Sequence, residues 1–163
     1  MHESATYNIY NTTNLVELQR CVHAFEVYYA QKGGRSPRDE NFSHLMASAI
    51  LERVEKESGA IWCAWVGDRM VGFCVGVVEE STQYDRIAEG VQHLYGKVTD
   101  IFVRDEVRGQ DIGSQLIRHT EQTLKEKGIT KIHLEVIVDN DEVVSFYEKN
   151  GYKKESIILA KSM

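Results

Sequence analysis

The chain has 163 residues, which is the length of one ordinary domain. Its 19 Lys and Arg residues against 25 Asp and Glu residues give a net charge of −6, which disfavours a non-specific nucleic-acid binder because such proteins need a basic face. No apolar run approaches the roughly 18–20 residues of a membrane span, and residues 1–9 lack the apolar core of a signal peptide. These features predict one domain over residues 1–163, in the cytoplasm, with neither nucleic acid nor a membrane as partner.

The cysteines and histidines predict no metal site. Cys21, Cys63 and Cys74 form no Cys-x-x-Cys pair and lie in apolar surroundings, which is typical of reduced packing residues. No two of the six histidines are three or four positions apart, the spacing that would place two ligands on one face of a helix. We therefore expect buried thiols and no bound metal.

The N-terminal part of the chain predicts one strand and two helices. Residues 6–10 alternate weakly between apolar and polar side chains, as in a strand. Asn14 followed by Glu17 has the form of a capping box, and the apolar residues after it recur at helical spacing up to a glycine pair. Ser36 and Pro37 are expected to begin a second helix as its N-cap and first helical residue.

The rest of the chain alternates between predicted strands and helices. Segments 60–66 and 70–78 are rich in β-formers and predict a hairpin, and the polar segment 79–96 predicts a long loop with one helical turn. The further predicted elements are a strand at 97–103, a helix at 113–127, a strand at 130–138, a helix at 141–150 and a strand at 152–160. This order predicts an α/β fold in which helices cover both faces of a mixed, mostly antiparallel sheet.

The segment between residues 98 and 114 carries the most chemical information. A strand runs into a short charged loop, residues 104–110, that contains Gly109, and a helix begins near residues 111–113. A glycine-bearing loop that leads into a helix N-terminus exposes backbone N–H groups and the positive end of the helix dipole, which suits a phosphate. The pattern is neither a P-loop nor a dinucleotide-binding motif, and an ordinary strand–turn–helix connection has the same local spacing.

Two sequence blocks in the C-terminal half resemble motifs of one protein family, and they are stronger evidence together than the first block is alone. The first block is Arg108-Gly109-Gln110-Asp111-Ile112-Gly113. The second block consists of residues in and beside a predicted helix: Asn140, Val143, Phe146, Tyr147, Gly151 and Tyr152. The first resembles the acyl-CoA pyrophosphate loop of the GNAT N-acetyltransferases, Arg/Gln-x-x-Gly-x-Gly/Ala, with an aspartate at the first glycine. The second resembles that family's Asn-x-x-Ala-x-x-aromatic-Tyr-x-x-x-Gly-Phe/Tyr pattern, with valine for alanine, and the similarity covers residues 97–153.

The resemblance implies a fold and a co-substrate. In that family the sheet splays between its fourth and fifth strands, and acetyl-CoA lies in the gap, from which the acetyl group passes directly to an amine without a metal. By the match, backbone groups of Ile101, Phe102 and Val103 would contact the pantetheine and the thioester. Backbone amides of the loop and the first helical turn would hold the pyrophosphate, and these belong to Arg108, Gly109, Gln110, Asp111, Ile112, Gly113 and Ser114. Arg104 and Arg108 would add positive potential there.

The resemblance also implies catalytic groups. Tyr147 would be the general acid that protonates the leaving CoA thiolate, and it equally fits a packed aromatic residue. Asn140 resembles the position that bonds the pantetheine arm, and it also fits a helix N-cap. The expected general base is Asp100, or else Glu79 or Glu80 at the end of the preceding strand. A water chain could replace any of them, and each carboxylate also fits a solvated surface charge.

Asp111 separates this loop from the family pattern. A carboxylate beside a pyrophosphate is repulsive, by on the order of 1 kcal/mol at 4 Å in water. We expect the side chain to turn outward and cap the helix while the backbone adopts the angles of the missing glycine. Affinity for CoA is the property that this substitution would lower.

The acceptor is the least constrained part of the prediction. A small cationic amine is expected first and a protein or peptide amine second, because the segments that would bound the acceptor are the least family-like. Two other classes stay open: a non-catalytic acyl-CoA sensor of the same fold, and a structural or interaction domain that has lost CoA binding. A homodimer through Tyr28, Tyr29 or the last strand is compatible with the sequence, as is burial of these residues in the core.

Overall fold

The computed structural model describes residues 4–10, 12–90, 93–136, 140–156 and 161. Its strands and helices follow in this order: β1 (Thr6–Ile9), α1 (Leu15–Lys32), α2 (Glu40–Lys56), β2 (Ala60–Val66), β3 (Arg69–Glu80), α3 (Gln83–Glu89), β4 (Leu94–Val103), α4 (Ile112–Glu126), β5 (Ile132–Leu134) and α5 (Asp141–Lys149). Short 3-10 turns precede α1 (Thr12–Asn14) and follow β4 (Asp105–Val107). Within these ranges, no helix combines the length and the apolar character that crossing a membrane would take.

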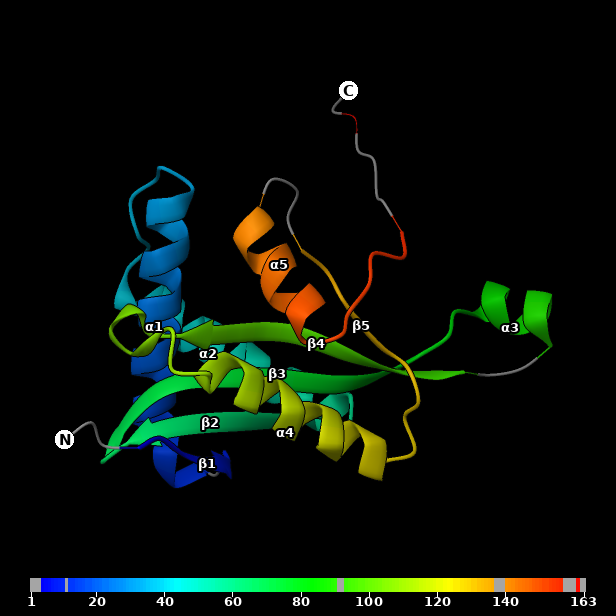
Figure 1. Ribbon diagram of the computed structural model, residues 1–163, viewed down its shortest axis with the longest axis horizontal. Helices are drawn as coiled ribbons and strands as arrows, with labels where there is room; N and C mark the ends of the chain where they lie inside the picture. Colours follow the sequence, from blue (N-terminus) through cyan, green and yellow to red (C-terminus); the bar gives the residue numbers. More distant parts are fainter. Residues whose placement is uncertain (1–3, 11, 91–92, 137–139, 157–160, 162–163) are drawn as a thin grey trace.

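The five strands form one mixed sheet in the order β1-β2-β3-β4-β5. Strands β1 to β4 pair antiparallel, and β4 and β5 pair in parallel. Figure 1 shows α4 in front of the sheet with α1 and α2 behind it. The predicted class, a mixed and mostly antiparallel sheet with helices on both faces, is confirmed.

One hydrophobic cluster lies on each face of the sheet. The cluster under α1 and α2 is built from Leu18, Cys21, Val22, Ala47, Ile50, Ile61, Cys63, Phe73, Val75, Val77 and Phe102, among others. The cluster under α4 and α5 includes Ala64, Val71, Cys74, Val98, Ile112, Leu116, Ile117 and Tyr147. Burial raises the pKa of each of the three thiols to about 12, so the cysteines are packing residues, as predicted.

The structure differs from both predicted helix starts. Asn14 is the N-cap residue of α1, as predicted, but the capping box is absent: the Asn14 side chain makes no capping bond, and Glu17 accepts a hydrogen bond from the N–H of Met70 at the start of β3. The second helix starts later than Ser36, since the side chain of Asp39 accepts a 2.9 Å hydrogen bond from the N–H of Phe42. A carboxylate at this position also gains from the positive end of the helix dipole.

The long loop predicted at 79–96 contains the ends of two strands and a helix. Glu79 pairs with Tyr95 and Glu80 with Leu94, so β3 and β4 extend their ladder into this segment, and α3 forms between them. Figure 1 shows α3 projecting at the far end of this hairpin. Ladder hydrogen bonds join backbone groups, and therefore polar side chains do not prevent the extension.

The C-terminal strands are shorter than predicted. The strand expected at 130–138 is present as β5 alone, and residues 137–138 lie outside the described residues. The last strand expected at 152–160 is wrong for residues 152–156, which form no strand. Residues 157–160 of that prediction lie outside the described residues.

Candidate active site

Strands β4 and β5 separate soon after they meet. They pair at only three positions: Gly96 with Ile132, Lys97 with His133, and Val98 with Leu134. Strand β4 continues to Val103, so within the described ranges its edge has no strand partner beyond Val98 on this side. In Figure 1, α5 stands above this part of β4. The splay predicted between the fourth and fifth strands is confirmed.

A β-bulge at Thr99 decides which backbone groups face the splay. The register of β3 and β4 slips there, because Thr99 has no Cα partner on β3. Before the bulge, the N–H of Gly96 donates to the C=O of Lys131 on the β5 side. After it, the N–H of Arg104 donates to the C=O of Val71 on the β3 side. An inserted residue has therefore reversed the alternation along β4.

The reversal turns the backbone groups of Ile101 and Val103 toward the open side. In an antiparallel ladder, residues whose N–H and C=O face the partner strand alternate with residues whose groups face away. Because Arg104 faces β3, so does Phe102, and its ring is buried against α1. The C=O of Val103 accepts a 3.0 Å hydrogen bond from Nε of Arg108, which agrees with its outward direction.

The start of α4 presents further unpaired amides beside this edge. Gly109 and Asp111 have φ of 77° and 62°, so the loop makes two left-handed turns before the helix. The first helical hydrogen bond runs from the N–H of Gln115 to the C=O of Asp111. The N–H groups of residues 112–114 therefore have no acceptor within the helix, and the positive end of its dipole lies there. Such a terminus suits an anion.

The carboxylate of Asp111 is turned away from these amides. Its Oδ2 atom accepts hydrogen bonds from Arg118, at 2.6 Å, and from Gln115, at 3.2 Å. The expected outward direction and left-handed backbone are confirmed, whereas the expected side-chain cap is absent. Arg118 is not among the residues expected from the sequence. The sequence signal for this pair is its spacing: Arg118 lies two helical turns after Asp111, and helical side chains lean toward the N-terminus of the helix.

Helix α5 packs directly on the first turn of α4. A Cβ atom at Gly113 would lie 3.2 Å from two ring atoms of Phe146, so the glycine allows this close approach. The contact brings the neighbouring Tyr147 to the splay, where its ring centroid lies 5.6 Å from that of Tyr152. Burial raises the pKa of Tyr147 well above its ordinary value. The phenol therefore keeps its proton across the physiological range and can act as a donor.

Asp100 lies in the same region as two tyrosines. Its negative charge adds to burial in raising the pKa of Tyr147 on α5, and it also contributes, after burial and Tyr28, to the raised pKa of Tyr29 on α1. Among the described residues, no cation lies within ion-pair distance (4.0 Å) of Asp100. The three side chains come from β4, α1 and α5, so only the tertiary structure brings them together.

Glu79 and Glu80 both have cationic neighbours. The Oε1 atom of Glu79 accepts a 2.8 Å hydrogen bond from Arg53 and lies 3.6 Å from Nζ of Lys97. Glu80 lies 3.7 Å from Arg86 of α3, and its side chain is largely exposed. Asp100 and Glu79 both add to the raised pKa of Arg53, whose largest cause is its hydrogen bond to Glu57, but of the three carboxylates only Asp100 also acts on Tyr147.

Three other predicted residues have definite positions. Asn140 precedes α5 without a side-chain capping bond, so its amide is not used by the helix. The guanidinium of Arg108 lies 2.8 Å from Asp105 and 4.2 Å from the ring centre of Tyr28. Arg104 donates hydrogen bonds to backbone carbonyls at the start of β3 and in α1. Within the described ranges, no cluster of side chains is suited to a metal.

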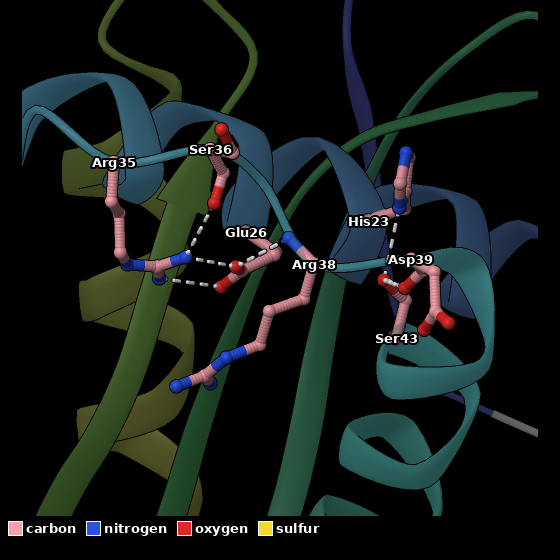
Figure 2. A network of polar contacts seen from close by, with 7 residues as sticks. All are labelled: His23, Glu26, Arg35, Ser36, Arg38, Asp39 and Ser43. Carbon is pink, nitrogen blue, oxygen red and sulfur yellow. Dashed lines mark hydrogen bonds and ion pairs between the residues drawn. The ribbon is translucent and has the colours of Figure 1, made fainter.

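A buried carboxylate that the sequence analysis did not identify ties the loop after α1 to that helix. Glu26 accepts hydrogen bonds from the guanidinium of Arg35, at 2.6 and 3.0 Å, and from the N–H of Arg38, at 3.1 Å (Figure 2). The bonds from Arg35 hold the pKa of Glu26 below its usual range. The same end of α1 reaches α5, because Lys32 lies 3.7 Å from Glu142. Glu26 therefore orders a loop that borders the splay.

Comparison with known proteins places this geometry in a family. Residues 19–152 match the sequence model described as the acetyltransferase (GNAT) family. A putative ribosomal protein bS18-alanine N-acetyltransferase of Bacillus subtilis is 34% identical over 128 residues, which cover 72% of this chain and 78% of that protein. The chloroplastic GCN5-related N-acetyltransferase 7 of Arabidopsis thaliana is 28% identical over 94 residues, 58% of this chain, and the match spans only 30% of that protein's length.

The fold is also similar to solved structures. An aminoglycoside acetyltransferase from an uncultured soil metagenomic sample, in complex with trehalose, superposes with a TM-score of 0.69. The superposition covers 98% of this chain and 96% of that one at 17% sequence identity. At this identity the likeness concerns the fold alone.

Proposed function

Because the chain belongs to the GNAT acetyltransferase family, we propose that it transfers an acetyl group from acetyl-CoA directly to a primary amine. The observation that carries the proposal is the open edge of β4, which leads into the exposed amides at the start of α4. An extended amide-bearing arm can add to a free strand edge, and a pyrophosphate suits a helix N-terminus. Pantetheine and pyrophosphate are joined in this order in CoA.

The donor would be held mainly by backbone groups. The outward N–H and C=O groups of Ile101 and Val103 would bind the pantetheine arm, and the side chain of Asn140 would add a hydrogen bond. Amides of residues 108–114 would hold the pyrophosphate. The present contact of Arg108 with the C=O of Val103 would have to open as the arm binds.

The reaction needs three proton and electron-pair movements. The neutral amine attacks the thioester carbon, a C–N bond forms, and the negative charge that develops on the carbonyl oxygen is stabilised by an edge N–H of β4. The C–S bond then breaks, and the hydroxyl of Tyr147 donates its proton to the leaving thiolate. The amine's surplus proton passes to a base, and from there Tyr147 is reprotonated through solvent.

Asp100 is the proposed base. An alkyl ammonium has a pKa near ~10.4 and must lose a proton before attack. Asp100 lies in the same region as Tyr147 and has no ion-pair partner among the described residues, whereas Glu79 already accepts a hydrogen bond from Arg53. Glu80 stays a weaker candidate because it lies beside α3.

The proposed acceptor is a small cationic amine. Tyr29, which is 39% exposed, offers a ring face in the region of Asp100, and aromatic faces and carboxylates both attract ammonium groups. The second candidate is the N-terminal amine of a protein. The similarity to the Bacillus subtilis protein, which is described as a ribosomal protein alanine N-acetyltransferase, favours that candidate.

Two measurements test the proposal. Calorimetry with acetyl-CoA should detect binding; its absence would rule out the enzyme and the acyl-CoA sensor together and leave an interaction domain. A thiol-release assay would then compare a polyamine, an aminoglycoside and a peptide with N-terminal alanine. Turnover of the first two supports the small-amine acceptor, and turnover of the peptide alone supports the protein acceptor. Binding without thiol release for any amine would indicate the sensor.

A further inference from the structure

Asp111 stands where the pyrophosphate loop of this family has a glycine. Its backbone keeps the left-handed conformation that a glycine would adopt, with φ of 62°. The residue therefore preserves the path of the loop, and the change lies in its charge. A carboxylate now sits at the entrance to α4, beside the N–H groups of residues 112–114.

An unpaired carboxylate at this place would oppose a phosphate. Two like charges a few ångströms apart near a protein surface repel strongly enough to weaken binding by roughly tenfold or more. The positive end of the helix dipole would attract the carboxylate as well as the phosphate, so the two would compete for the same amides. Phosphate binding therefore requires an interaction that keeps the Asp111 carboxylate away from these amides.

Arg118 provides this interaction. Its Nη2 atom lies 2.6 Å from Oδ2 of Asp111, and the amide of Gln115 donates to the same oxygen at 3.2 Å. Both partners are on the outer surface of α4, and they draw the carboxylate along the helix instead of across its end. Burial is the main cause of the raised pKa of Tyr7 on β1. The charge of Asp111 raises this pKa further and the charge of Arg118 lowers it, so the two charges partly offset each other at Tyr7.

We infer that Arg118 is a positioning residue for CoA: it holds the Asp111 carboxylate away from the phosphate-binding amides and neutralises its charge. The inference rests on the proposed function, since it concerns the same loop. It assigns Arg118 an action through Asp111 and not a contact with the phosphate. The loop of this chain would thus tolerate the missing glycine because a second residue, two helical turns away, compensates for the aspartate.

The pair is poorly suited to a role in stability. The side chains of Asp111 and Arg118 are 57% and 54% exposed, and exposed ion pairs contribute little to the free energy of unfolding. Variants of either residue should therefore stay folded, with a thermal midpoint close to that of the wild type. An effect on CoA affinity can then be read separately from an effect on folding.

A double-mutant cycle tests the inference. The four proteins are the wild type, Asp111→Gly, Arg118→Gln and the double variant, and the probes are CoA, by calorimetry, and pantetheine, by NMR titration. Arg118→Gln should weaken CoA binding about tenfold and leave pantetheine binding unchanged, because pantetheine has no phosphate. In the Asp111→Gly background the same change should alter CoA affinity less than about twofold. Lys125→Gln, a charge loss farther along α4, is the matched control and should have no effect on either ligand.

The other outcomes separate this inference from the proposed function. If the wild type does not bind CoA, the proposed function fails and this inference fails with it. If the wild type binds CoA and Arg118→Gln binds equally well, only the inference is overturned. If Arg118→Gln loses the same affinity with Asp111 and with Gly at position 111, Arg118 contacts the phosphate directly, which also overturns the positioning role.

Discussion

The Oε1 atom of Glu26 lies 2.6 Å from Nη1 of Arg35, and its Oε2 atom lies 3.0 Å from Nη2. This two-point contact joins a carboxylate that is 7% exposed on α1 to the loop that precedes α2 (Figure 2). Bidentate pairs of this kind stabilise the contact and also restrict the relative orientation of the two side chains. The Glu26–Arg35 ion pair, which spans nine residues of sequence, therefore helps to fix the α1–α2 loop, together with the hydrogen bond that the N–H of Arg38 donates to Glu26.

Glu26→Gln should lower the free energy of unfolding by about 1–2 kcal/mol at neutral pH, because charge-assisted hydrogen bonds become neutral ones. The pKa of Glu26 is lowered in the folded state. Its contribution is therefore fully present above the unfolded-state pKa, near ~4.3, and is lost as the pH falls through the folded-state value. Urea unfolding at several pH values measures the difference, which should vanish in acid.

Glu52→Gln is the control for this measurement. Glu52 also pairs with a cation, Lys56 at 2.6 Å, but both side chains are exposed. The loss of this pair in Glu52→Gln should leave the free energy of unfolding equal to that of the wild type, within experimental error, at every pH. An equal loss in the two variants would show that the Glu26 pair behaves as an ordinary surface contact.

Tyr147→Phe should lower kcat by about a hundredfold or more and leave the Kd for CoA within about twofold, because the hydroxyl acts on the leaving thiolate and not on ground-state binding. Single-turnover thiol release and calorimetry give the two numbers. Tyr152→Phe, which removes the hydroxyl of the neighbouring ring, should turn over normally. Unchanged kcat in Tyr147→Phe would remove Tyr147 from the mechanism.

The pH dependence provides an independent check on Tyr147. Its pKa is raised by burial, so the phenol stays protonated well above pH 10. The value of kcat/KM should therefore rise with pH up to about pH 10 as the amine loses its proton, without an alkaline decline in that range. A decline below that pH that disappears in Tyr147→Phe would contradict the raised pKa.

Asp100→Asn should lower kcat/KM for the acceptor by about a hundredfold with little change in CoA affinity, because a carboxamide cannot accept the proton of the ammonium. Glu80→Gln, in a side chain turned to α3, should be near wild type in the same assay. Equal losses of kcat/KM in the two variants would show that the carboxylates act through their combined negative charge and that Asp100 is not a specific base. Normal turnover in Asp100→Asn would favour a water chain as the base.

Gly76→Ala should destabilise the fold by about 1–3 kcal/mol, because the added Cβ would lie 2.4 Å from Cγ2 of Thr120 in the buried face between β3 and α4. The thermal midpoint should fall by about 2–4 °C per kcal/mol. Thr120→Ser removes that methyl group and keeps the hydroxyl, so it should restore part of the loss. The same loss in both backgrounds would place the strain elsewhere.

Local patterns predicted the elements whose signals lie within a short stretch of chain. The hairpin of β2 and β3, the helix that begins after Asp111 and the short helix before Gly151 follow from β-rich runs, glycine punctuation and helical spacing. The capping box at Asn14 and the cap at Ser36 were predicted wrongly, because Glu17 and Asp39 have hydrogen-bond partners that local spacing does not specify. A cap is one hydrogen bond, and another acceptor or donor nearby is enough to displace it.

By itself, the sequence determined the loop of residues 108–113, the aromatic block around Tyr147 and the order of the elements as far as α5, because each is encoded by residues close together along the chain. Only the tertiary structure decided the outward edge at Val103, the contact of Asp111 with Arg118 and the hydrogen bond of Glu79 with Arg53. Each of these depends on register or on a partner from another turn or element. Hydrogen bonds and ion pairs form at a few ångströms, and folding alone sets which distant residues come that close.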